Sequence, residues 1–175
     1  MTPINISFRP LAVSDLDNVV VWAREEEVAF WWHETDSTED VLRAKWEARA
    51  RSEDEKTRIF IISVDTADIG VIQTYRLADY PDHAAEVQLP DSSGIDVFIG
   101  IPEWRDRGVG TAIVRQFVAE VVFADQSVQR CAIDPEPENR RAIRAYEKAG
   151  FQHVRSYRSQ ANDVDVYLMA TERAD

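Results

Sequence analysis

A continuous apolar run followed by turn residues predicts one central strand of this chain. Residues 59–64 form such a run, as expected for a strand that is covered on both faces. The polar tetrapeptide at 65–68 has turn chemistry and predicts a hairpin to a second strand at 69–75. Further strands are expected at residues 4–9, 94–101, 129–134, 151–156 and 164–170.

Apolar residues at helical spacing predict the helices that separate these strands. Leu16, Val19 and Val20 recur at that spacing from two residues after Ser14 onward. Ser14 and Asp17 together resemble a capping box. Three more helices are expected at residues 37–51, 111–124 and 138–149, the last ending at Gly150. Residues 77–93 are polar and hold Pro81 and Pro90, which favours a loop, with or without a helical turn.

This order predicts a mixed α/β protein with about seven strands and about four helices. The βα units lie in the second half of the chain. No internal repeat, low-complexity tract or flexible linker divides the 175 residues, so a single domain over 1–175 is expected. That length is sufficient to bury a sizeable core.

The net charge of the chain limits the classes of ligand that are expected. The formal net charge is −12, which argues against nucleic acid because phosphates require a basic surface. An acidic cleft would instead concentrate a cationic ligand. Many proteins are acidic for solubility alone, so the charge permits a polyamine-like acceptor without selecting one.

The sequence shows no targeting signal and few side chains that could act as nucleophiles or metal ligands. No apolar run approaches the length of a membrane span, and residues 1–5 lack the basic and apolar regions of a secretory signal. Cys131 is the only cysteine, so no internal disulfide can form; this fits a cytoplasmic location. It lies in an expected strand and resembles a small buried hydrophobe more than a nucleophile. His33, His83 and His153 lack metal-ligand spacing, and no metal site is expected.

The junction between the strand at 94–101 and the helix at 111–124 carries the most informative motif. Its glycines, Gly108 and Gly110, permit positive φ and let a ligand approach the backbone. Amides at a helix start favour an anion there, and Arg105 and Arg107 add charge. Taken alone, the motif is either such an anion site or an ordinary turn.

A second motif, at residues 139–151, follows one helix–strand unit later. Together, Arg-x-x-Gly-x-Gly and Asn-(x)₆-Tyr-Glu-Lys-Ala-Gly-Phe closely resemble the acyl-CoA-binding motifs of the GNAT N-acetyltransferases. Shorter segments resemble, in the same order, the aminoglycoside 6′-N-acetyltransferases of that superfamily. These segments are 30–32, 69–75, 94–96, 133–135 and 141–143, and the likeness spans about residues 6–169.

The resemblance implies acetyl-CoA as the cofactor and a mixed sheet that splays open near residues 94–101 to grip it. The cofactor-binding residues that it implies are Val97, Phe98, Ile99, Arg105, Arg107, Gly108, Val109, Gly110, Thr111, Asn139, Ala142, Tyr146 and Lys148. Without the resemblance, Val97 and Ile99 are ordinary strand core, Asn139 is a helix cap, and Lys148 is a solvated cation.

Asp96 and Tyr146 are the catalytic candidates. Asp96 alternates away from Ile95 on the strand, and the resemblance implies that it binds or helps to deprotonate the acceptor ammonium. An ordinary aspartate is a poor base for an amine, so it works through water or orients the substrate. Tyr146 lies on an apolar helix face and is either a core aromatic or a general acid toward the departing thiolate.

The acceptor-binding residues that the resemblance implies are Trp31, Trp32, Gln73, Tyr75, Asp96, Asp134 and Asp163. Several of these residues also have a purely structural interpretation. Asp134 before Pro135 is a common turn residue, and Gln73 with Tyr75 forms a half-exposed strand face. The adjacent aromatics at 30–32 are typical of a loop tucked onto the core. The resemblance implies instead that one tryptophan of the pair contacts an aminosugar, and the alternative for Trp32 is a buried side chain.

The sequence therefore predicts a cytoplasmic N-acetyltransferase that acetylates the 6′-amine of an aminoglycoside by direct transfer in a ternary complex. Two alternatives stay open: another amine (a siderophore lysine precursor, a polyamine or a protein amine), or a regulatory domain that binds acyl-CoA without catalysis. A monomer and a homodimer are both compatible with the sequence. The loop at 77–93 lacks the aromatic-rich character of the closest resistance enzymes, and the register near Asn162 is ambiguous, so the range of drugs is left open.

Overall fold

The computed structural model describes residues 4–174 and places them in two compact units. Unit 1 comprises residues 4–73 and 97–107, and unit 2 comprises residues 74–96 and 108–174. Part of the expected signal-free N-terminus, residues 1–3, lies outside the described residues. Within the described part of the chain, no helix has the length and apolar character needed to cross a membrane.

Seven strands form within residues 4–174, as predicted, and they pair in the order β1-β2-β3-β4-β5-β7-β6. Their bounds are β1 Ile6–Pro10, β2 Thr57–Val64, β3 Ala67–Arg76, β4 Ser92–Ile99, β5 Arg130–Ile133, β6 Gln152–Arg158 and β7 Asp165–Glu172. β1 pairs antiparallel with β2, β4 runs parallel to β5, and β7 pairs antiparallel with both β5 and β6. The mixed α/β class is confirmed.

Six α-helices, rather than about four, form in the same residues. Their bounds are α1 Leu16–Ala23, α2 Glu26–Trp31, α3 Glu39–Arg51, α4 Pro81–Val87, α5 Val109–Phe117 and α6 Arg140–Ala149. The prediction missed α2 and α4, because each is too short to show a clear apolar period. α4 also shows that the expected loop at 77–93 was wrong: Pro81 occupies its first turn, where a missing N–H costs nothing.

The caps of the helices differ in detail from the sequence prediction. The capping box at Ser14 was wrong: a 3₁₀ turn, Val13–Asp15, precedes α1, and the Asp15 carboxylate accepts from the Ala12 amide at 2.9 Å. Thr38 caps α3 by accepting from the Val41 amide. Gly150 ends α6 with φ 105°, as predicted.

Unit 1 holds an aromatic and aliphatic core between α1, α3 and the strands. Trp46 and Leu42 of α3 are buried with Ile61 of β2 and Val71 of β3. Gly70 has no room for a side chain, since a Cβ there would lie 2.1 Å from the Phe98 carbonyl oxygen. The close approach brings the β3 and β4 backbones of this unit together.

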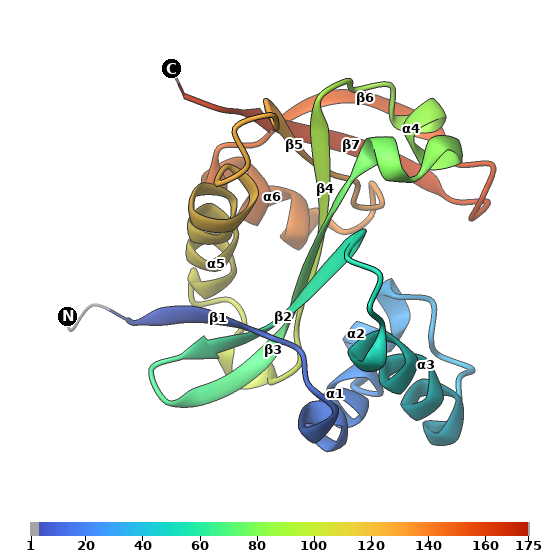
Figure 1. Cartoon of the computed structure of the whole chain (residues 1–175), viewed down its shortest axis with the longest axis vertical. Helices are drawn as coiled ribbons and strands as arrows, with labels where there is room; N and C mark the ends of the chain where they lie inside the picture. The colour runs from blue at the N-terminus through green and yellow to red at the C-terminus, as the bar shows by residue number, and fades with distance from the viewer. Residues whose placement is uncertain (1–3, 175) are drawn as a thin grey trace. The chain divides into compact units, whose positions relative to one another are not determined.

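Unit 2 packs helices on its strands, and in Figure 1 α5 and α6 lie together to one side of β4 while α4 lies to the other. Ala132 of β5 and Leu168 of β7 are buried against Val87 of α4. Their neighbours Cys131 and Met169 are also fully buried, so alternation directs them to the opposite face.

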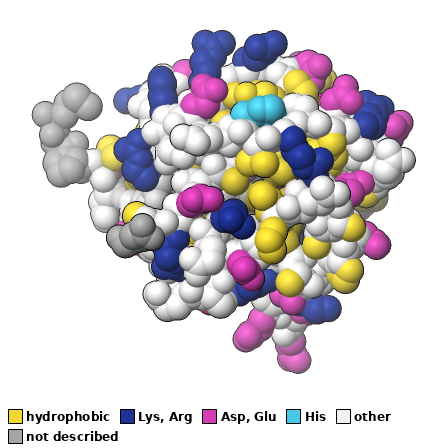
Figure 2. All heavy atoms as spheres, turned by 90° about the horizontal axis from the view of Figure 1, so that it is seen from above, with side chains coloured by type: hydrophobic (Ala, Val, Ile, Leu, Met, Phe, Trp, Pro, Cys, Tyr) yellow, Lys and Arg dark blue, Asp and Glu magenta, His cyan; other side chains and the backbone are white. Residues whose placement is uncertain are grey.

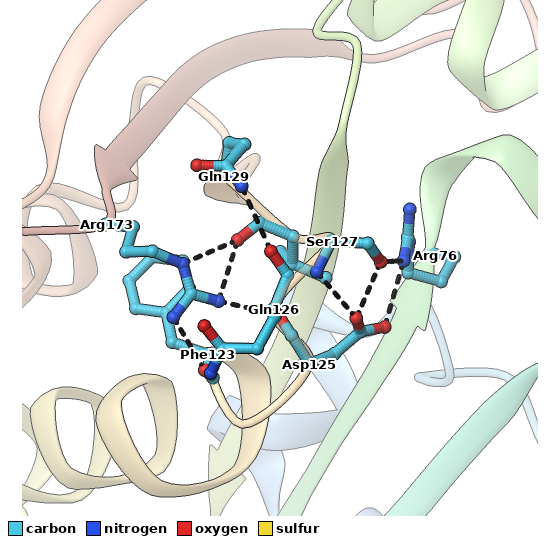
Figure 3. A network of polar contacts seen from close by, with 8 residues as sticks. Arg76, Phe123, Asp125, Gln126, Ser127, Gln129 and Arg173 are labelled. Atoms are coloured by element: carbon cyan, nitrogen blue, oxygen red, sulfur yellow. Dashed lines mark hydrogen bonds and ion pairs between the residues drawn. The ribbon is translucent and has the colours of Figure 1, made fainter. Parts of the chain in front are cut away.

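Two arginines fix the segment that leads into β5 (Figure 3). The Arg173 guanidinium donates to the carbonyl oxygens of Phe123, Asp125 and Val128, and lies over the Phe123 ring. Arg76 binds the Asp125 carboxylate at 2.9 Å. These contacts set where β5 begins, and therefore where Asp134 emerges four residues later.

Candidate active site

The β4–β5 pair of unit 2 opens just before the first candidate residue. The two strands pair from Ser92↔Arg130 to Gly94↔Ala132, so Asp96 lies two residues beyond the last paired residue of β4. Gly94 faces Tyr75 so closely that a Cβ would meet the phenol ring at 2.5 Å. Since side chains alternate along a strand, Asp96 shares the face of Gly94 and therefore lies on the Tyr75 side, opposite the fully buried Ile95.

Asp96 and Asp134 interact electrostatically in unit 2. Burial, followed by the negative charge of Asp96 and then that of Glu86, raises the pKa of Asp134 to about 8. Asp134 comes directly after β5, and its side chain is only 27% exposed. Two carboxylates that disfavour each other's charge in this way favour either a proton or an external cation between them.

The Tyr146 phenol of α6 lies close enough to both carboxylates for their negative charges to raise its pKa. Burial first, and then Asp96 and Asp134, raises the pKa of its phenol far above the ordinary value. The phenol therefore stays protonated, which is the form that can donate a hydrogen bond. The structure thus brings together Asp96, Asp134 and Tyr146, the three residues on which the sequence argument placed most of the chemistry.

Tyr75 and His83 extend the same group of side chains. The Tyr75 hydroxyl lies 3.4 Å from His83 Nε2, and the same nitrogen lies 3.9 Å from Asp134 Oδ2. Burial and then Asp96 raise the pKa of Tyr75 well above its usual value. His83 was set aside in the sequence prediction because it has no metal-ligand spacing. Its position depends on α4, which the pattern of apolar residues did not reveal.

Tyr157 of β6 is a further residue that sequence reasoning missed. Its hydroxyl is buried, and among residues 4–174 no hydrogen-bond partner for it is found. Burial and the charge of Asp134 raise its pKa to about 12, and Arg155 lies 4.4 Å over its ring. We call Asp96, Asp134, Tyr75, Tyr146, Tyr157 and His83 the acidic cluster.

Glu86, by contrast, is held by the protein itself. Its carboxylate accepts from the Ser159 hydroxyl at 2.9 Å and from the Gln160 amide at 2.6 Å. The Gln160 amide and then the Ser159 hydroxyl lower the pKa of Glu86. Glu86 therefore joins α4 to the turn between β6 and β7 and adds its negative charge to that of Asp134.

The start of α5 has the backbone geometry of an anion site. Gly108 has φ 76°, and a Cβ placed on it would meet nothing within 4 Å, so the space over this backbone is open. Val109 is buried and anchors the first turn, while the Thr111 hydroxyl donates to the Ala145 carbonyl of α6. The amides of this turn, Gly110 included, are directed to where the helix dipole favours phosphate.

Asn139 is the N-cap of α6: its side-chain oxygen accepts from the Ala142 amide at 3.2 Å. The cap reading of the sequence is confirmed, and a contact to pantetheine stays a prediction. Lys148 and Arg107 are exposed, Ala142 is half-buried, and the cofactor contacts of all three also stay predictions.

Arg105 has protein partners throughout unit 1. Its guanidinium donates to Glu27 at 2.8 Å, to Glu25 at 2.5 Å and to the Ile99 carbonyl at 2.7 Å. Glu25 also caps α2, accepting from the Val28 amide. With its side chain only 10% exposed, Arg105 ties α2 to the end of β4. These contacts favour a positioning role over the predicted phosphate contact.

The paired tryptophans do not lie in a loop: Trp31 is the last residue of α2, and Trp32 is its C-cap. Trp32 packs edge-on against Phe98 at 5.0 Å between ring centroids, and Phe98 also packs against Trp46. Trp31 is half-buried beside the exposed Phe30. Trp32 is therefore a core contact, as the alternative reading held, and an acceptor contact of Trp31 stays a prediction.

Gln73 and Ile99, two other predicted residues of unit 1, have partners within the protein. Gln73 is buried, and its side-chain oxygen accepts from Arg49 at 3.4 Å. Val97 and Ile99 are half-buried, and the Ile99 carbonyl accepts from Arg105. A contact of Gln73 to the acceptor and a role of Val97 and Ile99 in holding the cofactor arm both stay predictions.

Asp163 is far less enclosed than the other predicted carboxylates. It lies in the turn between β6 and β7 with φ 54°, its side chain is 90% exposed, and Arg158 pairs with it at 2.9 Å. Asp163 and Asp165 together raise the pKa of Arg158. The contacts describe a surface ion pair, and a contact to the acceptor stays a prediction.

Cys131 is fully buried in β5, and burial raises the pKa of its thiol far above the usual value. A thiolate nucleophile is thereby excluded at this position, in agreement with the sequence prediction. Figure 2 shows acidic, basic and apolar side chains interspersed on the face seen there, so the net charge does not form one acidic surface on that side.

A family model described as an acetyltransferase (GNAT) domain matches residues 12–158. The aminoglycoside N(6′)-acetyltransferase type 1 of Klebsiella pneumoniae is 28% identical over 173 residues, which are 97% of this chain and 85% of that protein. A kanamycin resistance protein of Rhizobium radiobacter is 38% identical over 85 residues, covering 49% of this chain and 77% of that protein.

Solved structures with the same fold include the aminoglycoside acetyltransferase AAC(6′)-Ib. Its complex with coenzyme A has a TM-score of 0.83 and 26% identity, covering 97% of this chain and 95% of that one. Its complex with coenzyme A and kanamycin has a TM-score of 0.82, with the same identity and coverage.

Proposed function

Because this chain belongs to the GNAT acetyltransferase family, as its sequence motifs predicted, we propose that it acetylates the 6′-amine of aminoglycosides with acetyl-CoA as the donor. The acidic cluster of unit 2 is the observation that carries the proposal. Two enclosed carboxylates, Asp96 and Asp134, raise each other's affinity for a positive group and lie beside the protonated Tyr146. The relatives AAC(6′)-Ib and the Klebsiella enzyme support the choice of acceptor.

The open backbone before α5 fits the donor. Gly108, Val109, Gly110 and Thr111 offer amides and a helix N-terminus, which suit a pyrophosphate. When bound there, acetyl-CoA supplies a thioester whose carbonyl carbon accepts the amine. The role of Arg105 is to fix the β4 backbone at Ile99, next to the residues predicted to bind the cofactor arm.

The acceptor must reach the site as an ammonium and react as a neutral amine. Asp96 and Asp134 bind the ammonium, because each then gains a cation in place of a like charge. Asp96, on the open side of β4, receives the proton directly or through water as the amine attacks the thioester. The amine nitrogen then forms the new bond to the acetyl carbon, and the bond from that carbon to sulfur breaks.

Tyr146 stabilises the departing sulfur by donating a hydrogen bond from its phenol. A phenol with so high a pKa is a weaker acid than a thiol, whose ordinary pKa is about 8.5. The phenol therefore keeps its proton for most of the reaction, and the proton that leaves the amine finally neutralises the thiolate. The Tyr146 phenol therefore contributes electrostatically: it stabilises the negative charge that develops on the sulfur in the transition state.

We further propose that the two units form one acetyltransferase domain acting in the cytoplasm without nucleic acid, as a monomer or homodimer. Direct transfer in a ternary complex is part of the same proposal. It is favoured by the burial of Cys131, the one thiol in the sequence.

The test is transfer by the purified chain from acetyl-CoA to kanamycin or tobramycin, followed as release of free thiol. NMR of the product locates the acetyl group, which we expect on the 6′ nitrogen. An aminoglycoside with a hydroxyl at the 6′ position is the matched control and should release no thiol above background. Spermidine, lysine amide and a peptide N-terminus, compared by kcat/KM, test the other amines.

A higher kcat/KM for one of those amines than for every aminoglycoside would replace the proposed acceptor. Calorimetry with coenzyme A separates the remaining alternative. Binding of coenzyme A without transfer to any amine would identify a regulatory domain, and the proposal of an enzyme would then be wrong.

A further inference from the structure

Glu86, near the C-terminal end of α4, is joined to β6 and to the turn that follows it. Its carboxylate accepts from the Ser159 hydroxyl at 2.9 Å and from the Gln160 amide at 2.6 Å. Its backbone carbonyl accepts from the Arg155 guanidinium. Ser159 is only 3% exposed, so its hydrogen bond to Glu86 is shielded from water. We call these three contacts the Glu86 hydrogen bonds.

The Glu86 hydrogen bonds lie on the face of the unit 2 strands that carries part of the acidic cluster. Arg155 and Tyr157 are alternate residues of β6, so their side chains share one face, and the guanidinium lies over the Tyr157 ring. Tyr157 pairs with Val166 of β7, and both residues pack in the same apolar cluster as Val87 of α4. α4 therefore covers this face beside Tyr157.

The position of α4 depends on its contacts with the rest of unit 2. The helix has seven residues, Pro81–Val87, and helices well below about 12 residues are marginal by themselves in water. Val87 supplies apolar burial, which is not directional. Glu86 supplies hydrogen bonds, which require a defined distance and angle. The Glu86 hydrogen bonds therefore fix where α4 lies.

α4 in turn places a side chain of the acidic cluster. His83 precedes Val87 by one helical turn, so both residues lie on the same side of α4. His83 Nε2 is 3.4 Å from the Tyr75 hydroxyl and 3.9 Å from Asp134 Oδ2. A shift of α4 would move the imidazole ring and deprive the Tyr75 phenol, which is predicted to contact the acceptor, of this partner.

Resting on the proposed function, we propose that Glu86 is a positioning residue for the acceptor: its hydrogen bonds to Ser159 and Gln160 hold α4 where His83 orients the Tyr75 phenol. Less free energy is lost on binding when the groups that contact a ligand are already ordered. The Glu86 hydrogen bonds therefore lower KM for the acceptor. The chemical step and the binding of acetyl-CoA do not depend on them, because the proposed proton acceptor, Asp96, lies on β4 and the proposed donor site lies at the start of α5.

The kinetic test uses Ser159→Ala, which removes one of the hydrogen bonds and keeps the Glu86 charge, so the charges around Asp134 stay the same. Ser156→Ala is the matched control: it makes the same substitution in β6, at an exposed serine that contacts His153. We expect KM for kanamycin to rise about tenfold in Ser159→Ala, as for the loss of a hydrogen bond to a charged group. The values of kcat and of the Kd for coenzyme A, measured by calorimetry, should equal those of the wild type.

An unchanged KM for kanamycin in Ser159→Ala would overturn the proposal. A weaker binding of coenzyme A by the same factor would also overturn it, because a general loss of structure would then explain both changes.

A double-mutant cycle tests whether Glu86 and Ser159 act through the same contact. Glu86→Ala removes the carboxylate that accepts both side-chain and amide hydrogen bonds, so adding Ser159→Ala to it should raise KM for kanamycin no further. Glu86→Gln keeps the length of the side chain and an oxygen for the Gln160 amide, and it should restore part of the loss. Additive increases in KM, or a Glu86→Gln variant no better than Glu86→Ala, would contradict the proposal.

Hydrogen exchange measures the hold on α4 without any acceptor. The Ala84 and Gln88 amides donate to the carbonyls of Tyr80 and Ala84, so their exchange reports the opening of α4. Both should exchange faster in Ser159→Ala than in the wild type and in Ser156→Ala. Unchanged exchange would refute the proposal even if the enzyme acetylates aminoglycosides. Faster exchange in a chain that acetylates no aminoglycoside would refute the proposed function, and with it the role in acceptor binding, and would leave the Glu86 hydrogen bonds as structural contacts.

Discussion

Two groups of carboxylates in this protein have opposite electrostatic surroundings. In unit 1, Glu25 and Glu27 share the guanidinium of Arg105, whose hydrogen bond is the main cause of the lowered pKa of Glu25. In unit 2, Asp134 has Asp96 and Glu86 as charged neighbours, and its pKa is raised to about 8. The protein thus supplies its own cation in the first group and leaves a positive position open in the second.

The difference separates a structural role from a functional one. A carboxylate that is paired with a cation of the protein lowers the free energy of the folded state. Such a carboxylate is already hydrogen-bonded and is not available to bind a ligand. Like charges enclosed together cost stability, and such a cost is retained where a ligand or a reaction makes use of it. By this criterion we infer that the acidic cluster is the binding site of the proposed cationic acceptor, whereas the Arg105 group holds the backbone.

Asp96→Asn should give the largest effect of any single change. It keeps the shape of the side chain and removes both the negative charge and the proton acceptor. We expect kcat/KM for the acceptor to fall by about 10²–10⁴-fold, the usual contribution of a general base. Steady-state kinetics measure this loss, and thermal unfolding should give a Tm equal to or above that of the wild type, because a charge repulsion is lost.

A fall in Tm large enough to explain the lost activity would place Asp96 among the structural carboxylates instead. Normal kinetics in Asp96→Asn would remove the residue from the reaction.

Arg105→Gln should have the opposite signature: a large loss of stability with a smaller direct effect on chemistry. It leaves Glu25 and Glu27 without their cation and the Ile99 carbonyl without its donor. We expect the free energy of unfolding to fall by about 2–4 kcal/mol, as for a broken ion pair of low exposure. Denaturant titration measures this loss, and KM for acetyl-CoA should rise if β4 shifts at Ile99.

Glu27→Gln is the matched control, since it removes one of the two carboxylates and keeps the guanidinium in place. Its loss of stability should be clearly smaller. If Arg105→Gln is as stable as the wild type but no longer binds coenzyme A, then Arg105 contacts the phosphates as the sequence predicted.

Asp134→Asn should show how much folding stability the acidic cluster costs, because the cost depends on pH. The folded protein holds the Asp134 proton up to about pH 8, whereas an unfolded chain releases it near pH 4, so the wild type loses stability as pH rises between these values. The variant lacks this dependence. Its free energy of unfolding should exceed that of the wild type at pH 8 by on the order of 2 kcal/mol, and the gap should shrink toward pH 5.

Urea unfolding at several pH values measures the gap. A difference in the free energy of unfolding that widens as pH falls would mean that Asp134 is stabilised as an anion in the folded state. Asp134 would then resemble Glu25 and would not differ from it.

The sequence predicted the seven strands, the class of the fold and the glycine turns because these depend on local patterns. Gly108 and Gly150 adopt positive φ as expected from their positions at helix ends. The grouping of Asp96, Asp134 and Tyr146 was also predicted, through motifs shared with a known family. Local spacing and the motifs together therefore predicted that these three side chains lie close to one another, and their role in a site stays a prediction.

Partners distant in sequence could not be predicted in the same way. Arg105 meets Glu25 and Glu27 across 80 and 78 residues, so its sequence context suggested a free cation near phosphate. His83 depends on α4, a helix of seven residues that shows no period, and Tyr157 lies in a polar-looking strand. Burial, which decides the electrostatics of all these residues, is set by the tertiary structure.

Asp163→Asn should give the smallest effect, and it tests the contrast from the side of the exposed carboxylates. Asp163 already has a cation, Arg158 at 2.9 Å, and its side chain is 90% exposed. Solvent screens such a pair, so it contributes little to stability. We therefore expect Tm and the acceptor kcat/KM to change little, the latter by less than about twofold. A much larger loss of kcat/KM, with Tm unchanged, would show that the acceptor draws Asp163 away from Arg158. In that case an internal cation would not be enough to mark a carboxylate as structural, and only the enclosed pair around Arg105 would keep that assignment.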